Sequence, residues 1–170
     1  MTTRVASELI EELEEEAVVT RRVLERVTDK DLEWRPHPRG RSLGELALHV
    51  AMVPGGVAEL GTAPSPAPAP DFSGPAPRPA RAAELGPALA QSIARAKELV
   101  GKLDDDALLE TFRIAKDGRD VLAMPRGKFL RSTMLNHWYH HRGQLTVYLR
   151  ALGLEVPSVY GPSADESPFG

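Results

Sequence analysis

The chain has 170 residues, of which 42% are hydrophobic and 26% are charged, and its formal net charge is −3. This length and composition are typical of one domain with its own core, so we expect a single domain over residues 1–170. The slightly acidic balance, without a basic stripe, disfavours a nucleic-acid binder. The absence of cysteine excludes disulfides, thiolate ligands and cysteine nucleophiles, and leaves His, Asp and Glu as the strong metal ligands.

The first predicted helix covers residues 3–27, where apolar side chains recur every three or four residues. A cluster of glutamates lies in its first half, at positions 11, 12 and 14–16, and three arginines lie in its second half, at positions 21, 22 and 26. This order suits the helix dipole, and the glutamates indicate a solvated outer face rather than a metal site. The N-terminal residues lack the basic and then apolar pattern of a signal peptide, and no apolar run approaches the about 20 residues of a membrane span. We therefore expect a cytoplasmic protein without a membrane contact.

The second predicted helix begins at a capping box formed by Ser42 and Glu45. His49 lies on it, three residues after an inward leucine, at or beside the apolar face. A single histidine in such a position is more often a core residue than a ligand. Glu45, one turn earlier, could serve as a fourth ligand or a general base, but capping alone explains its presence. His37, in the proline-containing connector before this helix, is interpreted as an ordinary loop histidine.

The middle of the chain separates two further helical regions. Residues 61–80 are rich in proline and alanine, which predicts an extended linker rather than a helix. A third helix is predicted over 81–103, followed by a short turn capped by Asp104. Residues 111–126 are expected to form a short hairpin or an irregular loop. The tail, 154–170, is too rich in proline and glycine for a helix and is expected to wrap along the helices.

The last predicted helix, residues 128–152, carries a histidine pair. His137 and His141 are four residues apart, so both imidazoles lie on one helix face, within an otherwise apolar stripe. Burying two imidazoles without partners is costly, which favours a shared ligand. His49 could supply a third imidazole from a facing helix, and three neutral imidazoles with an open fourth position are typical of catalytic or labile metal sites. His140 is expected to flank the site, hydrogen-bonded to it or supporting a ligand.

Several stretches together resemble the DinB-like family, also called the DinB/YfiT superfamily, and the resemblance covers nearly the whole chain. The matching stretches are LEWRP at 32–36, SLGELALH at 42–49, HWYHHRGQL at 137–145 and VPSVYGPSADE at 156–166. The resemblance implies an all-α fold, a four-helix bundle with one long crossover connection, often as a homodimer. It also implies a divalent metal, zinc or nickel, held by His49, His137 and His141, with His140 not usually a ligand.

Relatives in this family include metal-dependent thiol transferases and a maleylpyruvate isomerase that uses a low-molecular-weight thiol. The resemblance thus implies a metal-dependent enzyme, such as a thiol transferase, with a small-molecule substrate or thiol cofactor as partner. Two alternatives stay open: a metal-dependent hydrolase with Glu45 as base, and a non-catalytic, stress-associated metal-binding protein. Imidazole ligands alone do not select the metal. Trp138, exposed by helical phase, is a candidate contact in the homodimer, with packing under a loop as the equal alternative.

Overall fold

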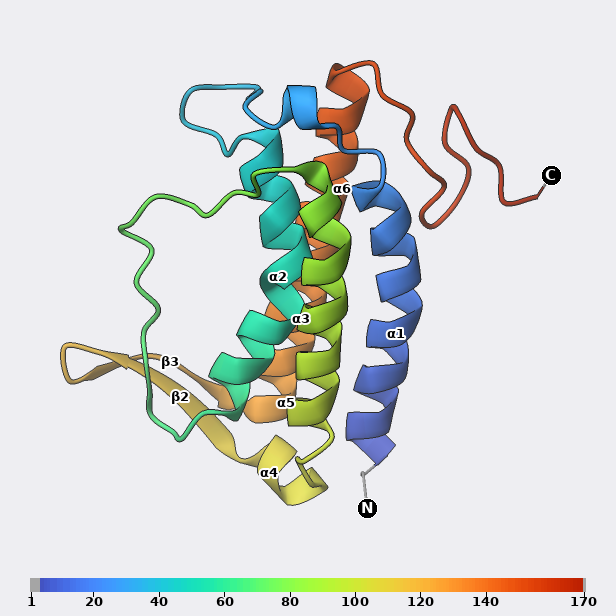
Figure 1. The fold of residues 1–170 in the computed structure, drawn as a ribbon. Coiled ribbons are helices and arrows are strands. Elements are labelled where there is room, and N and C mark those ends of the chain that lie inside the picture. Colours follow the sequence, from blue (N-terminus) through green and yellow to red (C-terminus); the bar gives the residue numbers. More distant parts are fainter. Residues whose placement is uncertain (1–3, 170) are drawn as a thin grey trace.

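The computed structural model describes residues 4–169, most of which are helical (Figure 1). The longer helices lie side by side around one apolar core, with α2 in contact with α3 and α6, and α1 in contact with all three. The helical elements are α1 (Arg4–Leu24), η1 (Asp29–Asp31), α2 (Leu43–Thr62), η2 (Ala82–Glu84), α3 (Leu85–Val100), α4 (Asp105–Leu109), α5 (Arg126–Phe129), η3 (Leu130–Asn136) and α6 (His137–Ala151). The strands are β1 (Ala67–Pro68), β2 (Thr111–Lys116) and β3 (Arg119–Pro125).

The helix predictions are confirmed in position but shift at their ends. Thr3, the predicted start of the first helix, lies outside the described residues, and α1 ends at Leu24 rather than Val27. The third helix is shorter than predicted, because a 3-10 turn occupies residues 82–84 before α3 begins. Asp104 caps α4 by accepting a hydrogen bond of 2.8 Å from the backbone N–H of Ala107, as expected.

The predicted capping box at the start of α2 is confirmed, but the helix continues to Thr62, through Pro54 and into the segment predicted to be a linker. Proline has no backbone N–H, so the carbonyl of Val50 loses its normal partner four residues on. The indole N–H of Trp138 donates to this carbonyl instead, at 2.8 Å. The next N–H, that of Gly55, donates to the hydroxyl of Ser92 on α3, also at 2.8 Å. Neighbouring helices thus accommodate the proline.

Helix α2 corrects the expectation that no segment is apolar enough to span a membrane. Among the described residues, Leu43–Thr62 has the length and composition of a span, with a mean hydropathy of 1.2 over its 18-residue window. However, 56% of that window is buried inside the protein. This burial is expected of a helix at the centre of a core, so the apolar character of α2 is explained by its packing.

The last helical stretch differs from a straight α-helix. It runs through α5, η3 and α6, and η3 is a π-helical segment, which adds a residue to the helical repeat. The buried seam therefore moves by one position relative to the predicted stripe, from His137 and His141 to Trp138 and Arg142. Trp138 is 0% exposed, so the prediction that it is a surface contact in a homodimer is wrong. The two histidines lie beside the seam and are half-buried.

The all-α prediction is wrong in one respect, because a small three-stranded sheet lies beside the helices (Figure 1). Strands β2 and β3 form an antiparallel hairpin, which confirms one of the two alternatives for residues 111–126. Its turn consists of Asp117 and Gly118, both with positive φ, as a type I′ hairpin turn requires. Strand β1, from the proline-rich segment, pairs in parallel with β2. Phe112 of the sheet packs against Phe129 of α5 and attaches the sheet to the helices.

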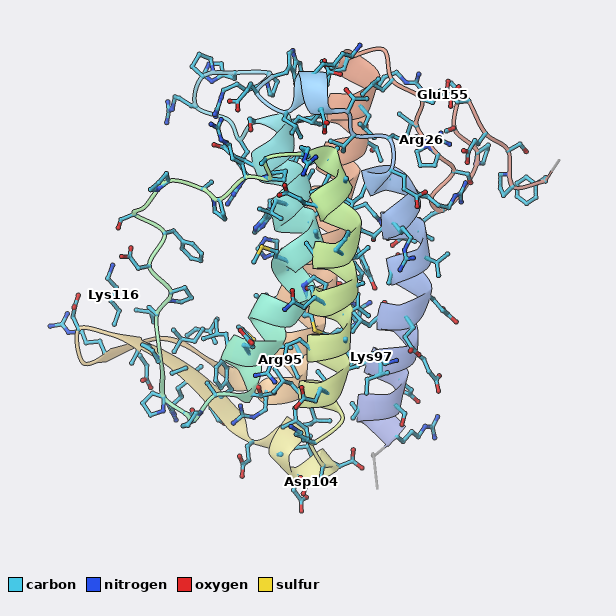
Figure 2. All side chains as sticks on the ribbon, viewed as in Figure 1. Arg26, Arg95, Lys97, Asp104, Lys116 and Glu155 are labelled. Atoms are coloured by element: carbon cyan, nitrogen blue, oxygen red, sulfur yellow. The ribbon has the colours of Figure 1, made fainter. Side chains whose placement is uncertain are left out.

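The tail after α6 lies along the helices, as predicted, and charged residues hold it there. Glu166 forms ion pairs with Arg22 and Arg26 of α1. Arg26 also lies 3.3 Å from Glu155, at the start of the tail (Figure 2). Asp165 forms an ion pair with Arg150 of α6. The tail therefore connects the ends of α1 and α6.

Candidate metal centre

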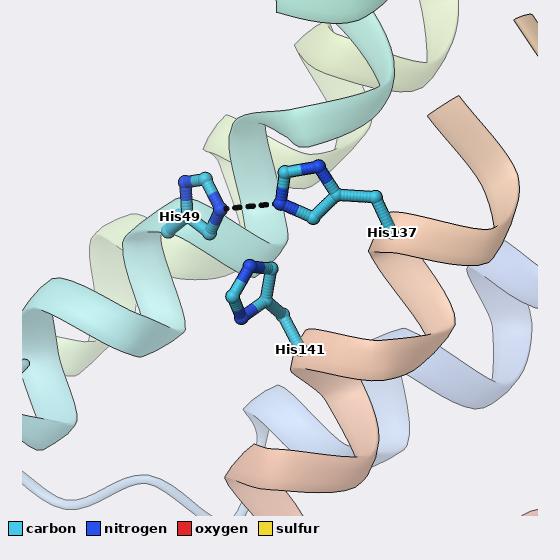
Figure 3. A group of neighbouring side chains, drawn as sticks. All are labelled: His49, His137 and His141. Carbon is cyan, nitrogen blue, oxygen red and sulfur yellow. Dashed lines mark hydrogen bonds between the residues drawn. The ribbon is translucent and has the colours of Figure 1, made fainter. Parts of the chain in front are cut away.

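Three imidazoles meet between α2 and α6 (Figure 3). His137 and His141 lie one turn apart on α6, and His49 approaches them from α2. The ring centroids are 5.4 Å apart for His49 and His137, and 4.5 Å apart for each of the other two pairs. One nitrogen of each ring lies within 4.8 Å of the other two. The structure thus brings together the three histidines that the sequence singled out.

The spacing of the nitrogen atoms fits a metal ion. The Nε2 atoms of His49 and His137 are 3.3 Å apart. In a tetrahedral zinc site with metal–nitrogen bonds of about 2.0–2.1 Å, two ligand nitrogens are about 3.3 Å apart. Among the described residues, no Asp or Glu joins the three histidines in this group. The donor set is therefore compatible with one metal ion held by three imidazoles.

Partial burial favours the uncharged form of the three imidazoles. Loss of solvation lowers the pKa of His49 to about 3, and the positive charge of Arg41 and the other two histidines lower it further. Burial also lowers the pKa of His137 and of His141, and Arg41 contributes to both shifts. Neutral imidazole is the form that binds a metal. At neutral pH, protons therefore compete weakly for this site.

Gln144 contacts one of the three histidines, and the sequence reasoning missed it. Its Oε1 atom lies 2.9 Å from Nδ1 of His141, one turn along α6. With the proton on Nδ1, the Nε2 atom of His141 is unprotonated and free to bind a metal. A hydrogen bond of this kind fixes the tautomer and orientation of a metal-binding imidazole. The spacing of three residues from His141 was the available signal for this contact.

Substituting Gln144 by leucine should weaken metal binding by about tenfold or more, because His141 loses the acceptor that fixes its tautomer. Gln144 is exposed, so the substitution should leave the fold intact. Zinc affinity, measured by competition with a chromophoric chelator, checks this expectation. Thr146→Ala, a second polar substitution on α6 outside the group of three, is the control. Equal affinities in wild-type and Gln144→Leu protein would contradict the role assigned to Gln144.

The carboxylate of Glu45 is engaged by the helix cap at Ser42 and by Arg35. Its carboxylate accepts a hydrogen bond of 2.7 Å from the backbone N–H of Ser42, and both carboxylate oxygens face Arg35, at 3.2 and 3.3 Å. The Ser42 hydrogen bond makes the largest contribution to lowering the pKa of Glu45, to which Arg35 adds. Glu45 is also outside the group of three histidines. These contacts oppose its use as a fourth ligand, and its role as a base stays a prediction.

The two remaining histidines lie outside the group of three. His140 is exposed, and its ring centroid is 4.9 Å from that of His141, in an edge-on arrangement. It flanks the site, as expected, but the hydrogen bond to a candidate ligand comes from Gln144 instead. His37 is exposed in its loop, where Nδ1 accepts a hydrogen bond of 3.1 Å from the backbone of Arg39. This contact agrees with the interpretation of His37 as an ordinary loop residue.

Comparisons with known proteins show the family of the chain. A sequence model of the DinB family matches residues 1–168. The protein YrdA of Bacillus subtilis (strain 168) is 33% identical over 157 residues, which span 91% of this chain and 88% of YrdA. The crystal structure of a DinB-like protein from Bacillus cereus ATCC 10987 superposes with a TM-score of 0.65 at 27% identity, over 89% of this chain and 95% of that one. A crystal structure from Exiguobacterium sibiricum 255-15, attributed to the same family, shares the fold with a TM-score of 0.68 at 20% identity, over 93% and 98% of the two chains. The chain therefore belongs to the DinB family.

Proposed function

We propose that His49, His137 and His141 bind one divalent metal ion, zinc or nickel, and that the protein is a metal-dependent enzyme acting on small molecules. The observation that carries this proposal is the convergence of three half-buried imidazoles from two helices, with two Nε2 atoms 3.3 Å apart. A site that only stabilises a fold usually has four protein ligands, whereas catalytic sites have three and an open position. The three-histidine group has the ligand number of the second kind, which supports the proposal.

The reaction that we propose is the transfer of a low-molecular-weight thiol to an electrophile. When bound, a zinc or nickel ion would favour the deprotonated, nucleophilic form of a thiol in the remaining position. The residues of the chain would hold the ion and orient it: the three imidazoles as ligands, and Gln144 through its hydrogen bond to His141. Hydrolysis is the weaker alternative, because its candidate base, Glu45, is hydrogen-bonded to Ser42 and Arg35.

The metal site is tested by the double substitution of His137 and His141 by alanine. The purified wild-type protein should contain about one equivalent of zinc or nickel, and the double variant should contain none after the same purification, because a single imidazole remains. Elemental analysis measures both. His140→Ala, which removes an exposed neighbouring imidazole, is the matched control and should retain the metal. Stoichiometric metal in the double variant would contradict the proposed ligands.

The proposed reaction is tested separately on metal-loaded protein. Thiol consumption is followed with a panel of electrophiles, beside ester and amide substrates that report hydrolysis. We expect activity with thiol and electrophile together that disappears in the double histidine variant and after chelation. Activity on esters or amides without a thiol would favour the hydrolase instead. Metal binding without activity in either panel would favour the non-catalytic alternative.

A homodimer in the cytoplasm remains part of the proposal. Trp138 is buried and cannot form the contact between copies, so another surface must do so. The outer face of α6 offers Val147, which is 66% exposed. Sedimentation equilibrium of the wild-type protein measures the association, and Val147→Glu identifies this surface if it shifts the protein towards the monomer.

A further inference from the structure

Residues 69–78, in the proline-rich segment between α2 and α3, form an arch that is fixed at both ends. Before the arch, Ala67 of β1 is fully buried in the small second core, against which Leu60 of α2 packs. At the far end of the arch, Arg78 forms an ion pair with Glu33. Glu33 belongs to the connector whose backbone accepts hydrogen bonds from the first turn of α2. The arch therefore runs alongside α2, from its C-terminal part to its N-terminal part (Figure 1).

The arch passes the face of α2 that carries His49. At 3.6 residues per turn, positions 45, 49, 56 and 60 of a helix lie within about 60° of one another, so they share one face. The two ends of the arch adjoin the two ends of this face. Leu60 packs against the core that holds the first end, and Glu45 pairs with Arg35, which follows the second attachment point by two residues. His49 lies between these two points on the same face.

The arch stands away from this face and carries an exposed aromatic ring. A methyl group added at Gly56 would meet no heavy atom of a neighbouring segment within 4 Å, so the face is open there. Phe72 of the arch is 84% exposed, and Met52, three residues after His49, is 49% exposed. Within residues 4–169, no hydrogen bond or ion pair joins residues 70–77 to another part of the chain. The middle of the arch is therefore held only through its ends.

The arch is long enough to close onto the helix. The stretch of α2 from Glu45 to Leu60 is about 22 Å long at the rise of an α-helix. The arch spans about 31 Å when it is extended as a polyproline helix, the conformation that its prolines favour. The excess length allows the middle of the arch to move onto α2 while both ends stay attached.

We propose that the arch is a lid over the three-histidine site, and that Phe72 covers the apolar body of a small molecule bound at the open position of the metal. This inference rests on the proposed metal site and adds the chemical class of its ligand, an aromatic or aliphatic molecule with the metal-binding atom at one end. Closure places the ring of Phe72 and the thioether of Met52 against that body and removes apolar surface from water. It also keeps bulk water out of the site. Phe72 is thus a specificity-determining residue.

The test compares an aromatic thiol with a small polar one on cobalt-loaded protein. Cobalt(II) replaces zinc in sites of this type and reports ligand exchange by visible absorption. Benzyl mercaptan and 2-mercaptoethanol are titrated into wild-type protein, Phe72→Ala and Phe169→Ala. The last variant removes the same side chain from the tail, where it is 85% exposed. We expect the wild type and Phe169→Ala to prefer benzyl mercaptan, and Phe72→Ala to bind it about tenfold more weakly with its affinity for 2-mercaptoethanol unchanged.

Closure of the lid is measured on the same protein by cleavage with chymotrypsin after Phe72. The ring is exposed in the free protein, so this bond should be cut readily. Saturation with benzyl mercaptan should slow the cleavage about tenfold, because the protease acts on the open form. Saturation with 2-mercaptoethanol, which has no body for Phe72 to cover, should leave the rate unchanged. Mass spectrometry of the fragments identifies the bond that is cut.

The outcomes separate the two proposals, and none of the measurements requires turnover. Wild-type protein that binds no cobalt overturns the metal site and the lid with it. Cobalt binding without a preference for benzyl mercaptan, or with the same preference in Phe72→Ala, overturns the lid alone. Unchanged cleavage after Phe72 at saturation with benzyl mercaptan also overturns the lid alone. A tenfold loss confined to benzyl mercaptan and to Phe72→Ala, together with slower cleavage of the wild type, supports the assignment.

Discussion

Replacing Trp138 by alanine should lower the free energy of unfolding by about 3–5 kcal/mol, the usual cost of deleting a large aromatic side chain from a core. Trp138 is 0% exposed and lies in the seam between α6 and its neighbouring helices. Its indole N–H also satisfies the carbonyl of Val50, at 2.8 Å. Chemical denaturation of the metal-free protein measures the loss. Val18→Ala, at an exposed position of α1, should change the stability by less than about 0.5 kcal/mol.

The contribution of this hydrogen bond can be separated from packing. Trp138→Phe keeps an aromatic ring but leaves the carbonyl of Val50 without a donor, which costs about 1–3 kcal/mol. Pro54→Ala restores a backbone N–H four residues after Val50, and this group can then donate to the same carbonyl. The double variant Trp138→Phe/Pro54→Ala should therefore lose less free energy of unfolding than the sum of the losses in the two single variants. Additivity within about 0.5 kcal/mol would show that the indole hydrogen bond does not compensate for Pro54.

The same tryptophan shows where the sequence stops being informative. Helical periodicity located the last helix, but it placed His137 and His141 in the buried stripe and Trp138 outside it. The π-helical segment η3 adds one residue to the repeat immediately before these positions. Whether such a segment forms depends on how α5 and α6 each pack against the other helices. A pattern with a period of 3.6 residues does not contain this information. Local signals were more reliable: the capping box at Ser42 and the cap at Asp104 both formed as predicted.

The candidate site was partly predictable for a similar reason. Two histidines four residues apart on a helix must share a face, so the pair His137 and His141 follows from local geometry. His49 comes from a helix 88 residues away, and the sequence suggested it only as a possible third partner, which the family resemblance then selected. The contact of Gln144 with His141 was missed, because it depends on the rotamers of both side chains.

The three-stranded sheet was not predicted, because it depends on a pairing between segments that are far apart in the sequence. The turn at Asp117 and Gly118 is a recognisable hairpin signal, and the region was indeed left open as a hairpin. Strand β1 consists of two residues in a segment rich in proline, and it pairs with β2 across more than 40 residues of chain. Its buried Ala67 belongs to a small second core with Phe112 and Phe129. No pattern within the segment indicates that pairing.

Replacing Arg142 by methionine should lower the free energy of unfolding by about 3 kcal/mol, because it leaves a partly buried carboxylate without its cation. Arg142 is 1% exposed, and its guanidinium lies 2.5 Å from the carboxylate of Glu16 on α1. It also donates to the hydroxyls of Thr20, at 3.1 Å, and Tyr160, at 2.5 Å. Methionine fills most of the volume but supplies none of these donors. Chemical denaturation measures the change.

Two further variants attribute the loss to this buried contact. Arg150→Met removes the same kind of side chain from the surface of α6, where its ion pair with Asp165 is partly exposed, and should cost less than about 1 kcal/mol. Adding Glu16→Gln to Arg142→Met removes the unpaired charge and should recover part of the stability. An equal loss for Arg142→Met and Arg150→Met would contradict the assignment. Arg142 directly follows His141 and joins α6 to α1 and to the tail. Its substitution should therefore also make the orientation of α6 less fixed, which should weaken metal binding.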